Sequence, residues 1–196
     1  MKQKLLWVGD DYRLKSGYGR VAREIFPYLA NKYDIHMYSI CYKGESNLYN
    51  VIDSNDGTAF GFDKLPSVMD SLKPDVTILI NDHKIIYGWL KSIFDNCKII
   101  HSNVIPYVCT EYVGVTMKDI DIYNRVSTHL LAMADFTINE FTKNNYKHPT
   151  KRLSHGYAGS IQCMDKKDAK IKLEIDQETF VFFSGSKNQP RKRLDI

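Results

Sequence analysis

The stretch Asp10-Asp11-Tyr12-Arg13-Leu14-Lys15-Ser16-Gly17-Tyr18-Gly19-Arg20 separates a short apolar run from a helical pattern. The run before it, residues 5–8, predicts a buried strand because four apolar residues stop at a Gly-Asp pair. After it, apolar residues recur on one face over residues 20–32, which predicts an amphipathic helix. A glycine loop between a strand and a helix suits an anion, because Gly17 and Gly19 let the backbone approach it and the helix end offers N–H groups. We therefore predict a phosphate site at Gly17 and Gly19, with a simple chain turn as the alternative.

The same glycines fit the dinucleotide pattern G-x-G-x-x-A, which suggests an NAD-dependent oxidoreductase as another alternative. That motif needs its first glycine directly after the strand and an acidic residue at the end of the second strand. Here a long segment separates Val8 from Gly17, and the expected second strand ends in Ser39-Ile40-Cys41-Tyr42. The spacing and the missing carboxylate therefore disfavour NAD.

Strand-like and helix-like patterns alternate along the first 155 or so residues, which predicts a doubly wound α/β fold with a parallel sheet. Residues 75–83 are the strongest strand pattern, since they are β-branched and nearly continuous. Further strands are expected at 35–40, 58–62, 98–101, 136–139 and 152–154, and helices at 65–72, 85–94, 119–134, 140–146 and 166–174. Residues 43–57 and the aromatic stretch 104–114 are expected to be irregular. We expect one domain over residues 1–164, followed at 165–196 by a linker helix and the first strand, residues 178–185, and loop of a second, truncated domain.

Composition limits the functional classes. The chain has 196 residues, of which 43% are hydrophobic and 26% charged, as in soluble globular proteins. Its net charge of +4 comes largely from the last ten residues, which favours a local anion site over a nucleic-acid-binding surface. The four cysteines form no C-x-x-C pair, and no signal peptide or membrane-spanning stretch is evident. We therefore expect a cytoplasmic protein without a transmembrane segment, a metal or a nucleic-acid partner.

The order of these features resembles the glycosyltransferases of the two-Rossmann-domain (GT-B) type, in particular their large retaining family that uses nucleotide-sugar donors. The resemblance covers nearly the whole chain, and its most specific piece is Ser184-Gly185-Ser186-Lys187-Asn188-Gln189-Pro190-Arg191-Lys192-Arg193-Leu194-Asp195. Members of the family carry an Arg and, five residues later, a Lys that hold the donor diphosphate. The resemblance implies that Lys187 and Lys192 take these positions, with Arg191 as a further cation. A solvated basic tract is the alternative interpretation.

The resemblance also implies roles for three histidines. His101 matches the position where many members place a His against the sugar or acceptor, and His83 is a second catalytic candidate at a strand end. His155, before Gly156, resembles the turn that faces the cleft, and Tyr107 and Glu111 are candidates for shaping the acceptor pocket. We expect the loops that contain Gly17, His83, His101 and His155 to follow strands and so to share one edge of the sheet. Each histidine could instead satisfy backbone groups.

The implied activity is transfer of a sugar, with retention, from a nucleotide-diphosphate donor to a hydroxyl of a glycan, lipid or protein acceptor. This would make the chain part of a hexosyltransferase-type enzyme that needs no cofactor and no metal, because fixed cations and helix ends stabilise the leaving diphosphate. Asp119-Ile120-Asp121 imitates the metal-binding motif of the other major glycosyltransferase fold, but lies in a helical pattern where its two carboxylates face different ways. The alternative function is a non-catalytic anion- or partner-binding domain with the same fold.

Overall fold

The computed structural model describes residues 2–110, 113–155 and 164–181. The chain divides into two units, residues 1–156 and 157–196, and the first holds the sheet. The strands are β1 (Gln3–Asp10), β2 (Tyr33–Ile40), β3 (Asn50–Asp53), β4 (Val76–Asp82), β5 (Asn103–Cys109), β6 (Leu130–Ala132) and β7 (Thr150–Arg152). The helices of this unit are α1 (Gly17–Leu29), α2 (Leu65–Leu72), α3 (His83–Asn96), α4 (Met117–Val126) and α5 (Asp135–Lys143).

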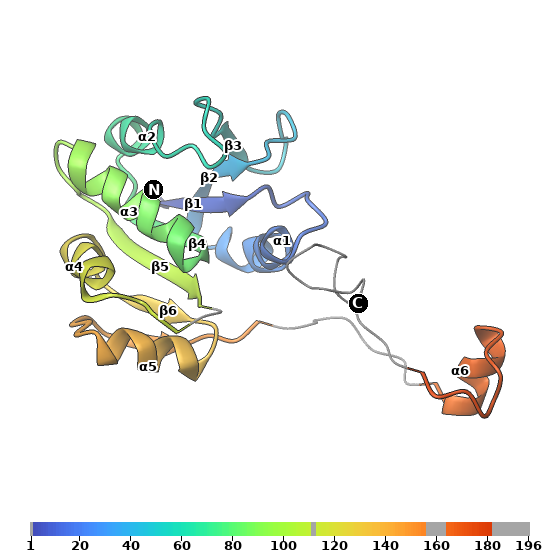
Figure 1. Cartoon of the computed structure of the whole chain (residues 1–196). Helices are drawn as coiled ribbons and strands as arrows, with labels where there is room; N and C mark the ends of the chain where they lie inside the picture. The colour runs from blue at the N-terminus through green and yellow to red at the C-terminus, as the bar shows by residue number, and fades with distance from the viewer. Residues whose placement is uncertain (1, 111–112, 156–163, 182–196) are drawn as a thin grey trace. The chain divides into compact units, whose positions relative to one another are not determined.

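All seven strands run parallel in the order β3-β2-β1-β4-β5-β6-β7. Helices lie on both faces of the sheet (Figure 1). This arrangement confirms the doubly wound, Rossmann-like α/β fold expected from the sequence. Because every strand points the same way, the ends of β1, β4 and β5 all lie at one carboxyl edge.

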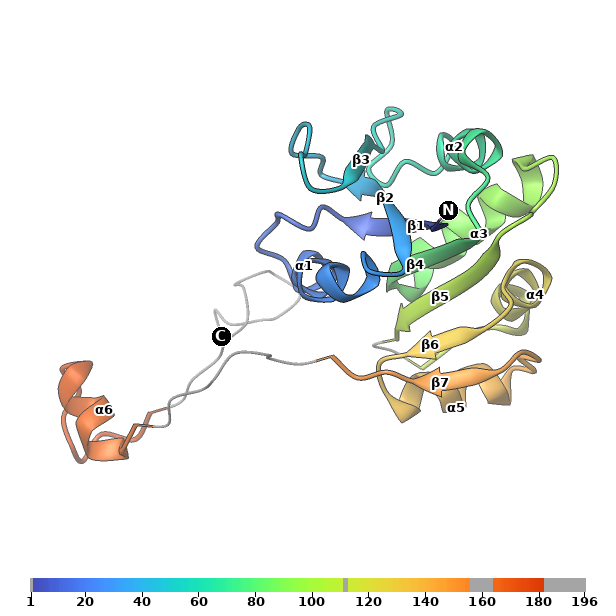
Figure 2. The same cartoon turned by 180° about the vertical axis from the view of Figure 1, so that it is seen from behind.

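The two faces of the sheet have separate cores. Leu6 and Val8 of β1 pack toward α2, α3, α4 and α5, whereas Leu5 and Trp7 pack toward α1. Both sets are buried because β1 is central and covered on both faces, which is why residues 5–8 read as a continuous apolar run. Among the described helices of the first unit, only α1 packs on the second face, and none covers β6 and β7 there (Figure 2).

Several expected strands are wrong, and two of them lie at residues 98–101 and 136–139. Residues 98–101 are irregular, and the strand begins at Asn103 and continues through Pro106. The proline is tolerated because β6 pairs with β5 only from Tyr107 onward. Residues 136–139 belong to α5, where Thr137 and Phe141, four residues apart, are buried on one side.

Other boundaries also differ from expectation. β3 lies inside the stretch 43–57 that was expected to be a loop, and residues 58–62 form bends and turns instead of a strand. The helix expected over 119–134 ends at Val126, and β6 follows it. The charged helix of the second unit is confirmed as α6 (Lys166–Lys172). Residues 178–181 are not a strand, and residues 182–185 of that expected strand lie outside the described residues.

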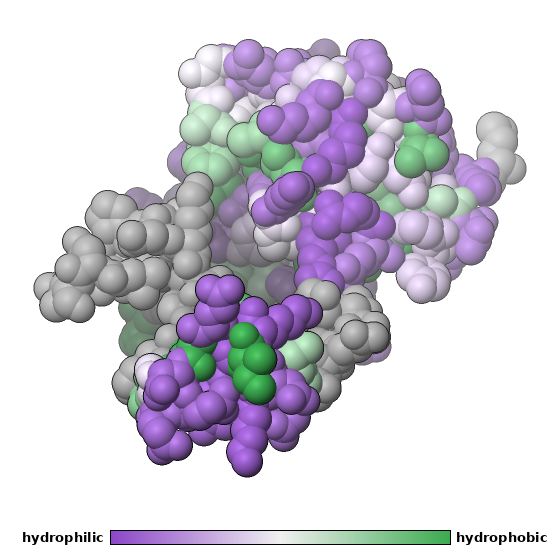
Figure 3. Space-filling model, turned by 90° about the vertical axis from the view of Figure 1, so that its right-hand side faces the viewer, coloured by the Kyte–Doolittle hydropathy of each residue, from purple (hydrophilic) through white to green (hydrophobic). Residues whose placement is uncertain are grey.

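The second unit exposes apolar side chains within its charged helix and after it. They include Ile171, Leu173 and Phe180, each with more than half of its surface exposed. In Figure 3 apolar atoms of this unit stand among hydrophilic ones. A unit this small cannot bury these residues by itself.

Candidate functional site at the carboxyl edge of the sheet

The strand order reverses beside β1, since β2 and β3 lie on one side and β4 to β7 on the other. In open α/β sheets, ligands bind in the crevice outside the carboxyl ends of the strands at such a switch point. Here β1 ends at Asp10 and the neighbouring β4 ends at Asp82. These two carboxylates therefore mark the place where a ligand is expected.

Both carboxylates accept hydrogen bonds from the start of α1. Ser16, the residue that caps the helix, donates its hydroxyl to Asp10 Oδ2 at 2.6 Å and accepts the backbone N–H of Gly19 at 3.0 Å. Tyr18 donates its hydroxyl to Asp82 Oδ1 at 2.6 Å. Burial first, and then Asp82, raise the pKa of Tyr18, so the phenol stays protonated and keeps donating. Asp82 precedes α3 but does not cap it with its side chain.

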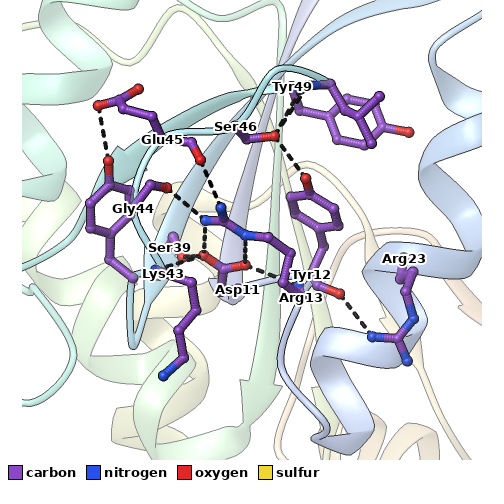
Figure 4. Close-up of polar contacts among 12 residues, drawn as sticks. Asp11, Tyr12, Arg13, Arg23, Ser39, Lys43, Gly44, Glu45, Ser46 and Tyr49 are labelled. Carbon is purple, nitrogen blue, oxygen red and sulfur yellow. Dashed lines mark hydrogen bonds and ion pairs between the residues drawn. The ribbon is translucent and has the colours of Figure 1, made fainter.

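The loop between β1 and α1 is held by a buried carboxylate, Asp11 (Figure 4). Arg13 donates from Nε to Asp11 Oδ1 at 2.8 Å and from Nη2 to Oδ2 at 2.7 Å, and Ser39 Oγ donates to Oδ2 at 2.9 Å. The same guanidinium donates to the carbonyls of Gly44 and Glu45, which ties this loop to the one after β2. Burial opposes ionisation, but the hydrogen bonds outweigh it and hold the pKa of Asp11 below its ordinary value.

Gly19 is needed for packing within this loop. A Cβ at Gly19 would lie 2.6 Å from the carbonyl oxygen of Asp11 and 3.0 Å from that of Leu14. A Cβ at Gly17 would meet nothing within 4 Å. From the sequence, both glycines were predicted to let the backbone approach a phosphate. At Gly19, the atoms that the missing side chain makes room for belong to the same loop. The nearby carboxylates also oppose an anion at this helix end.

On the other side of the edge, Tyr107 and His155 form a pair. Tyr107 is buried in β5, and its hydroxyl lies 2.7 Å from the carbonyl oxygen of Leu153 and 2.9 Å from His155 Nδ1. The His155 ring packs edge-on against Tyr107 and Tyr18, with ring centroids 5.7 Å and 6.5 Å away. His155 thus contacts Tyr18, whose hydroxyl binds Asp82. This contact connects the β5 side of the edge with the β1 side. We call the following residues the switch-point site: Asp10, Ser16, Tyr18, Asp82, Tyr107 and His155.

His83 does not belong to this site. It is the first residue of α3 and is fully buried, stacked on Tyr123 at 5.5 Å and edge-on to Phe141. Its Nδ1 lies 3.2 Å from the Tyr123 hydroxyl, and its Nε2 lies 3.5 Å from Asp119 Oδ2. Burial lowers the pKa of His83 despite the opposing effect of Asp119. The expectation of a catalytic His83 is corrected, because the side chain is a core residue with no surface for a substrate.

His101 lies at the opposite edge of the sheet. It precedes β5, whose first residue, Asn103, pairs with Val76 at the start of β4. The expectation that His101 follows a strand is therefore wrong, and with it the assignment of His101 to the same edge as Gly17. Its neighbours around a surface pocket are Asp70, Lys73, Lys98 and Ile99.

Several expected site residues, namely Glu111, Lys187, Arg191 and Lys192, lie outside the described residues. Asp119 forms a capping box with Thr116 at the start of α4, and its carboxylate lies 3.4 Å from Lys84 Nζ. Within the described ranges, no three His, Cys, Asp or Glu side chains gather as a metal site would require.

The sequence reasoning missed four members of the site, namely Asp10, Ser16, Tyr18 and Asp82. Tyr18 was passed over as the variable residue between two glycines. Asp82 ends the strongest strand in the sequence, and polar residues at the ends of buried parallel strands are a usable signal of a site.

The chain matches none of the known protein families with which it was compared, and no curated protein is significantly similar to it. In the part of the chain that the structure describes, no helix is both long enough and apolar enough to cross a bilayer.

Proposed function

We propose that this chain carries the acceptor-side domain of a glycosyltransferase, which moves a sugar with retention from a nucleotide-diphosphate donor to an acceptor hydroxyl. One observation supports this proposal above the others: the switch-point site combines carboxylate, phenol and imidazole groups at the edge where such folds bind ligands. These groups exchange hydrogen bonds with hydroxyls, and the partly exposed ring of Tyr18 suits the apolar face of a sugar.

The charge of the site favours a hydroxyl-bearing acceptor over a phosphate. Asp10 and Asp82 place two carboxylates beside the start of α1, and a phosphate there would meet like charge. Carboxylate oxygens instead accept hydrogen bonds from neutral hydroxyls. We therefore assign the acceptor, and not the donor diphosphate, to this edge.

The donor diphosphate is assigned to Lys187, Arg191 and Lys192 on the resemblance of their sequence alone. Three cations within six positions offset the charge that builds on a leaving diphosphate. A Lys at the position of the family's Arg keeps the charge but gives up bidentate binding of phosphate oxygens.

The NAD alternative is further disfavoured at the end of β2. An NAD-binding fold places a carboxylate there for the ribose, whereas this chain has Ser39, whose hydroxyl donates to Asp11. That hydroxyl is committed to the buried network.

The test is a thermal-shift titration of the 196-residue chain with UDP-glucose, GDP-mannose and NAD. We expect one nucleotide sugar to raise the melting temperature in a dose-dependent way, and a Lys187→Ala/Lys192→Ala variant to lose this effect while melting at the same temperature without ligand. The matched control is Lys166→Ala/Lys167→Ala, which removes two exposed cations from α6. A shift with NAD alone would replace the proposal with a dehydrogenase. Binding of a nucleotide sugar without sugar transfer would leave a non-catalytic binding domain.

A further inference from the structure

The hydrogen bonds of Tyr107 fix which nitrogen of His155 carries the proton. A phenol has one proton to donate. The carbonyl oxygen of Leu153 can only accept, and at 2.7 Å from the Tyr107 oxygen it requires that proton. Toward His155 Nδ1, 2.9 Å away, the Tyr107 oxygen must then be the acceptor. Nδ1 therefore carries the hydrogen, and in the neutral ring Nε2 carries the lone pair.

Hydrogen bonds hold the backbone in place at the two residues before His155. Leu153 donates its N–H to Ala132 O at 2.8 Å, and Ser154 donates its hydroxyl to Met133 O at 3.0 Å. Together with the Tyr107 bond, these contacts extend the pairing of β7 with β6 beyond Arg152. The imidazole is thus positioned by the sheet.

The second ring nitrogen of His155, Nε2, takes no part in these contacts. His155 is an exposed residue, and among the described residues its only hydrogen bond is the one at Nδ1. The groups packed against the ring are Tyr18 and Tyr107, and the nearest carboxylate in that chain of contacts is Asp82, which binds the Tyr18 hydroxyl. Desolvation lowers the pKa of His155, so its lone pair persists at neutral pH.

We propose that His155 Nε2 accepts the proton of the acceptor hydroxyl, with Tyr107 as the residue that positions the ring for this task. This inference rests on the proposed function and names the group that deprotonates the nucleophile. The acceptor O–H gives its proton to Nε2 while its oxygen bonds to the anomeric carbon on the face from which the diphosphate leaves, so that the configuration is retained. The bond between that carbon and the diphosphate oxygen breaks, and its electron pair leaves with the diphosphate. The imidazolium then returns its proton to water.

The first test reads the tautomer directly by long-range ¹H–¹⁵N NMR of the histidine-labelled chain at pH 7.5. We expect His155 as the Nδ1–H form, and a mixture of forms in Tyr107→Phe, which keeps the ring but removes the hydroxyl. Titration with methyl α-D-glucoside, a neutral hydroxyl-rich probe, should move the Nε2 resonance of His155 and leave that of His129 unchanged. An Nε2–H form, or no movement of the resonance, overturns the proposal even if no donor is found.

The second test measures transfer to the same glucoside from whichever nucleotide sugar binds. His155→Gln should lower kcat by about 100-fold or more, as the loss of a general base does, without weakening donor binding. The wild-type rate should fall as the pH drops through the pKa of His155, and the variant should lose this dependence. His129→Gln is the matched control and should behave as wild type. A His155→Gln variant with the wild-type rate and pH profile overturns the role of His155, whereas absent donor binding overturns the proposed function.

Discussion

The two sides of the carboxyl edge use polar groups in opposite ways. On the side of β1 and α1, the buried carboxylate of Asp11 receives hydrogen bonds from Arg13, Ser39 and the backbone of Lys43. On the side of β5 and β7, His155 is an exposed residue that is held at Nδ1, and its Nε2 makes no hydrogen bond with the described residues. A polar group whose bonds are all internal stabilises the fold, whereas one with an acceptor that makes no internal bond is suited to a ligand. Substitutions of Asp11 and of His155 should therefore separate stability from function.

The largest effect on stability is expected for Asp11→Asn. The amide keeps the shape but leaves the Arg13 guanidinium facing a neutral group, and its NH₂ opposes the Arg13 donors. We expect the free energy of unfolding to fall by about 2–4 kcal/mol. Urea denaturation measures it, with Asp121→Asn as control, since its exposed pair with Arg125 at 2.7 Å contributes about 0.5 kcal/mol or less. Equal losses in the two variants would contradict the distinction between the sides.

Because Asp11 is ionised, the free energy of unfolding should also depend on pH, by no more than the loss expected for Asp11→Asn. Because the pKa of Asp11 is lowered in the folded state, its contribution is complete above the unfolded value of about 3.9 and is lost as the pH falls through the folded pKa. The stability difference between wild type and Asp11→Asn should therefore shrink below about pH 4. His83 and His155 also have lowered pKa values, but their contribution is common to both proteins and cancels. A difference that is constant from pH 7 to pH 3 would argue against an ionised Asp11.

The next largest effect on stability is expected for substitution of Gly19, with Gly17 as the comparison. Gly19→Ala places a Cβ against two carbonyl oxygens and should destabilise the chain by about 1–3 kcal/mol, as overpacking does. Gly17→Ala meets open space at the start of α1 and should be neutral or slightly stabilising. Thermal and urea unfolding of the two variants provide the comparison. If Gly17→Ala proved the more damaging, the packing account of this loop would fail.

The smallest effects on stability are expected for two substitutions on the functional side, Tyr107→Phe and His155→Gln. Tyr107→Phe removes the hydrogen bonds to Leu153 and His155 and leaves the ring packing, so we expect a loss of about 1 kcal/mol. His155→Gln should change stability by about 0.5 kcal/mol or less, as exposed substitutions do. Calorimetry of both variants, set beside their NMR and transfer results, separates the two roles. A loss of several kcal/mol in His155→Gln would make His155 a structural residue like His83.

The fold was predictable because the pattern of apolar residues identifies the buried central strands. Residues 5–8 and 75–83 read as strands buried on both faces, and they are the adjacent central strands β1 and β4. Errors arose where apolar runs are short. The spacing of apolar residues in 136–139 fits a strand as well as a helix. Only the burial of Thr137 and Phe141 on one side identifies the segment as a helix. Pro106 suggested an irregular segment, because the sequence does not say which strand lies beside it.

The site was only partly predictable, because a histidine after a strand has no signature of its burial. His83 and His155 both place Nδ1 near a tyrosine hydroxyl, yet one is enclosed by α4 and α5 and the other is exposed. That difference depends on Tyr123 and Phe141, which come from helices far along the chain. His101 failed for another reason: a strand start misplaced by a few residues moves a side chain to the other edge of the sheet.

The position of β1 has a consequence for how the protein is made. β1 is synthesised before both of its neighbours in the sheet, and the second of them, β4, begins only at Val76. Until the ribosome has delivered that strand, one side of β1 has no hydrogen-bonding partner, and Leu6 and Val8 lack the helices that bury them. Such long-range pairing slows folding and leaves unpaired strand edges open to aggregation. The nascent chain therefore passes through a vulnerable interval that ends when β4 joins the sheet.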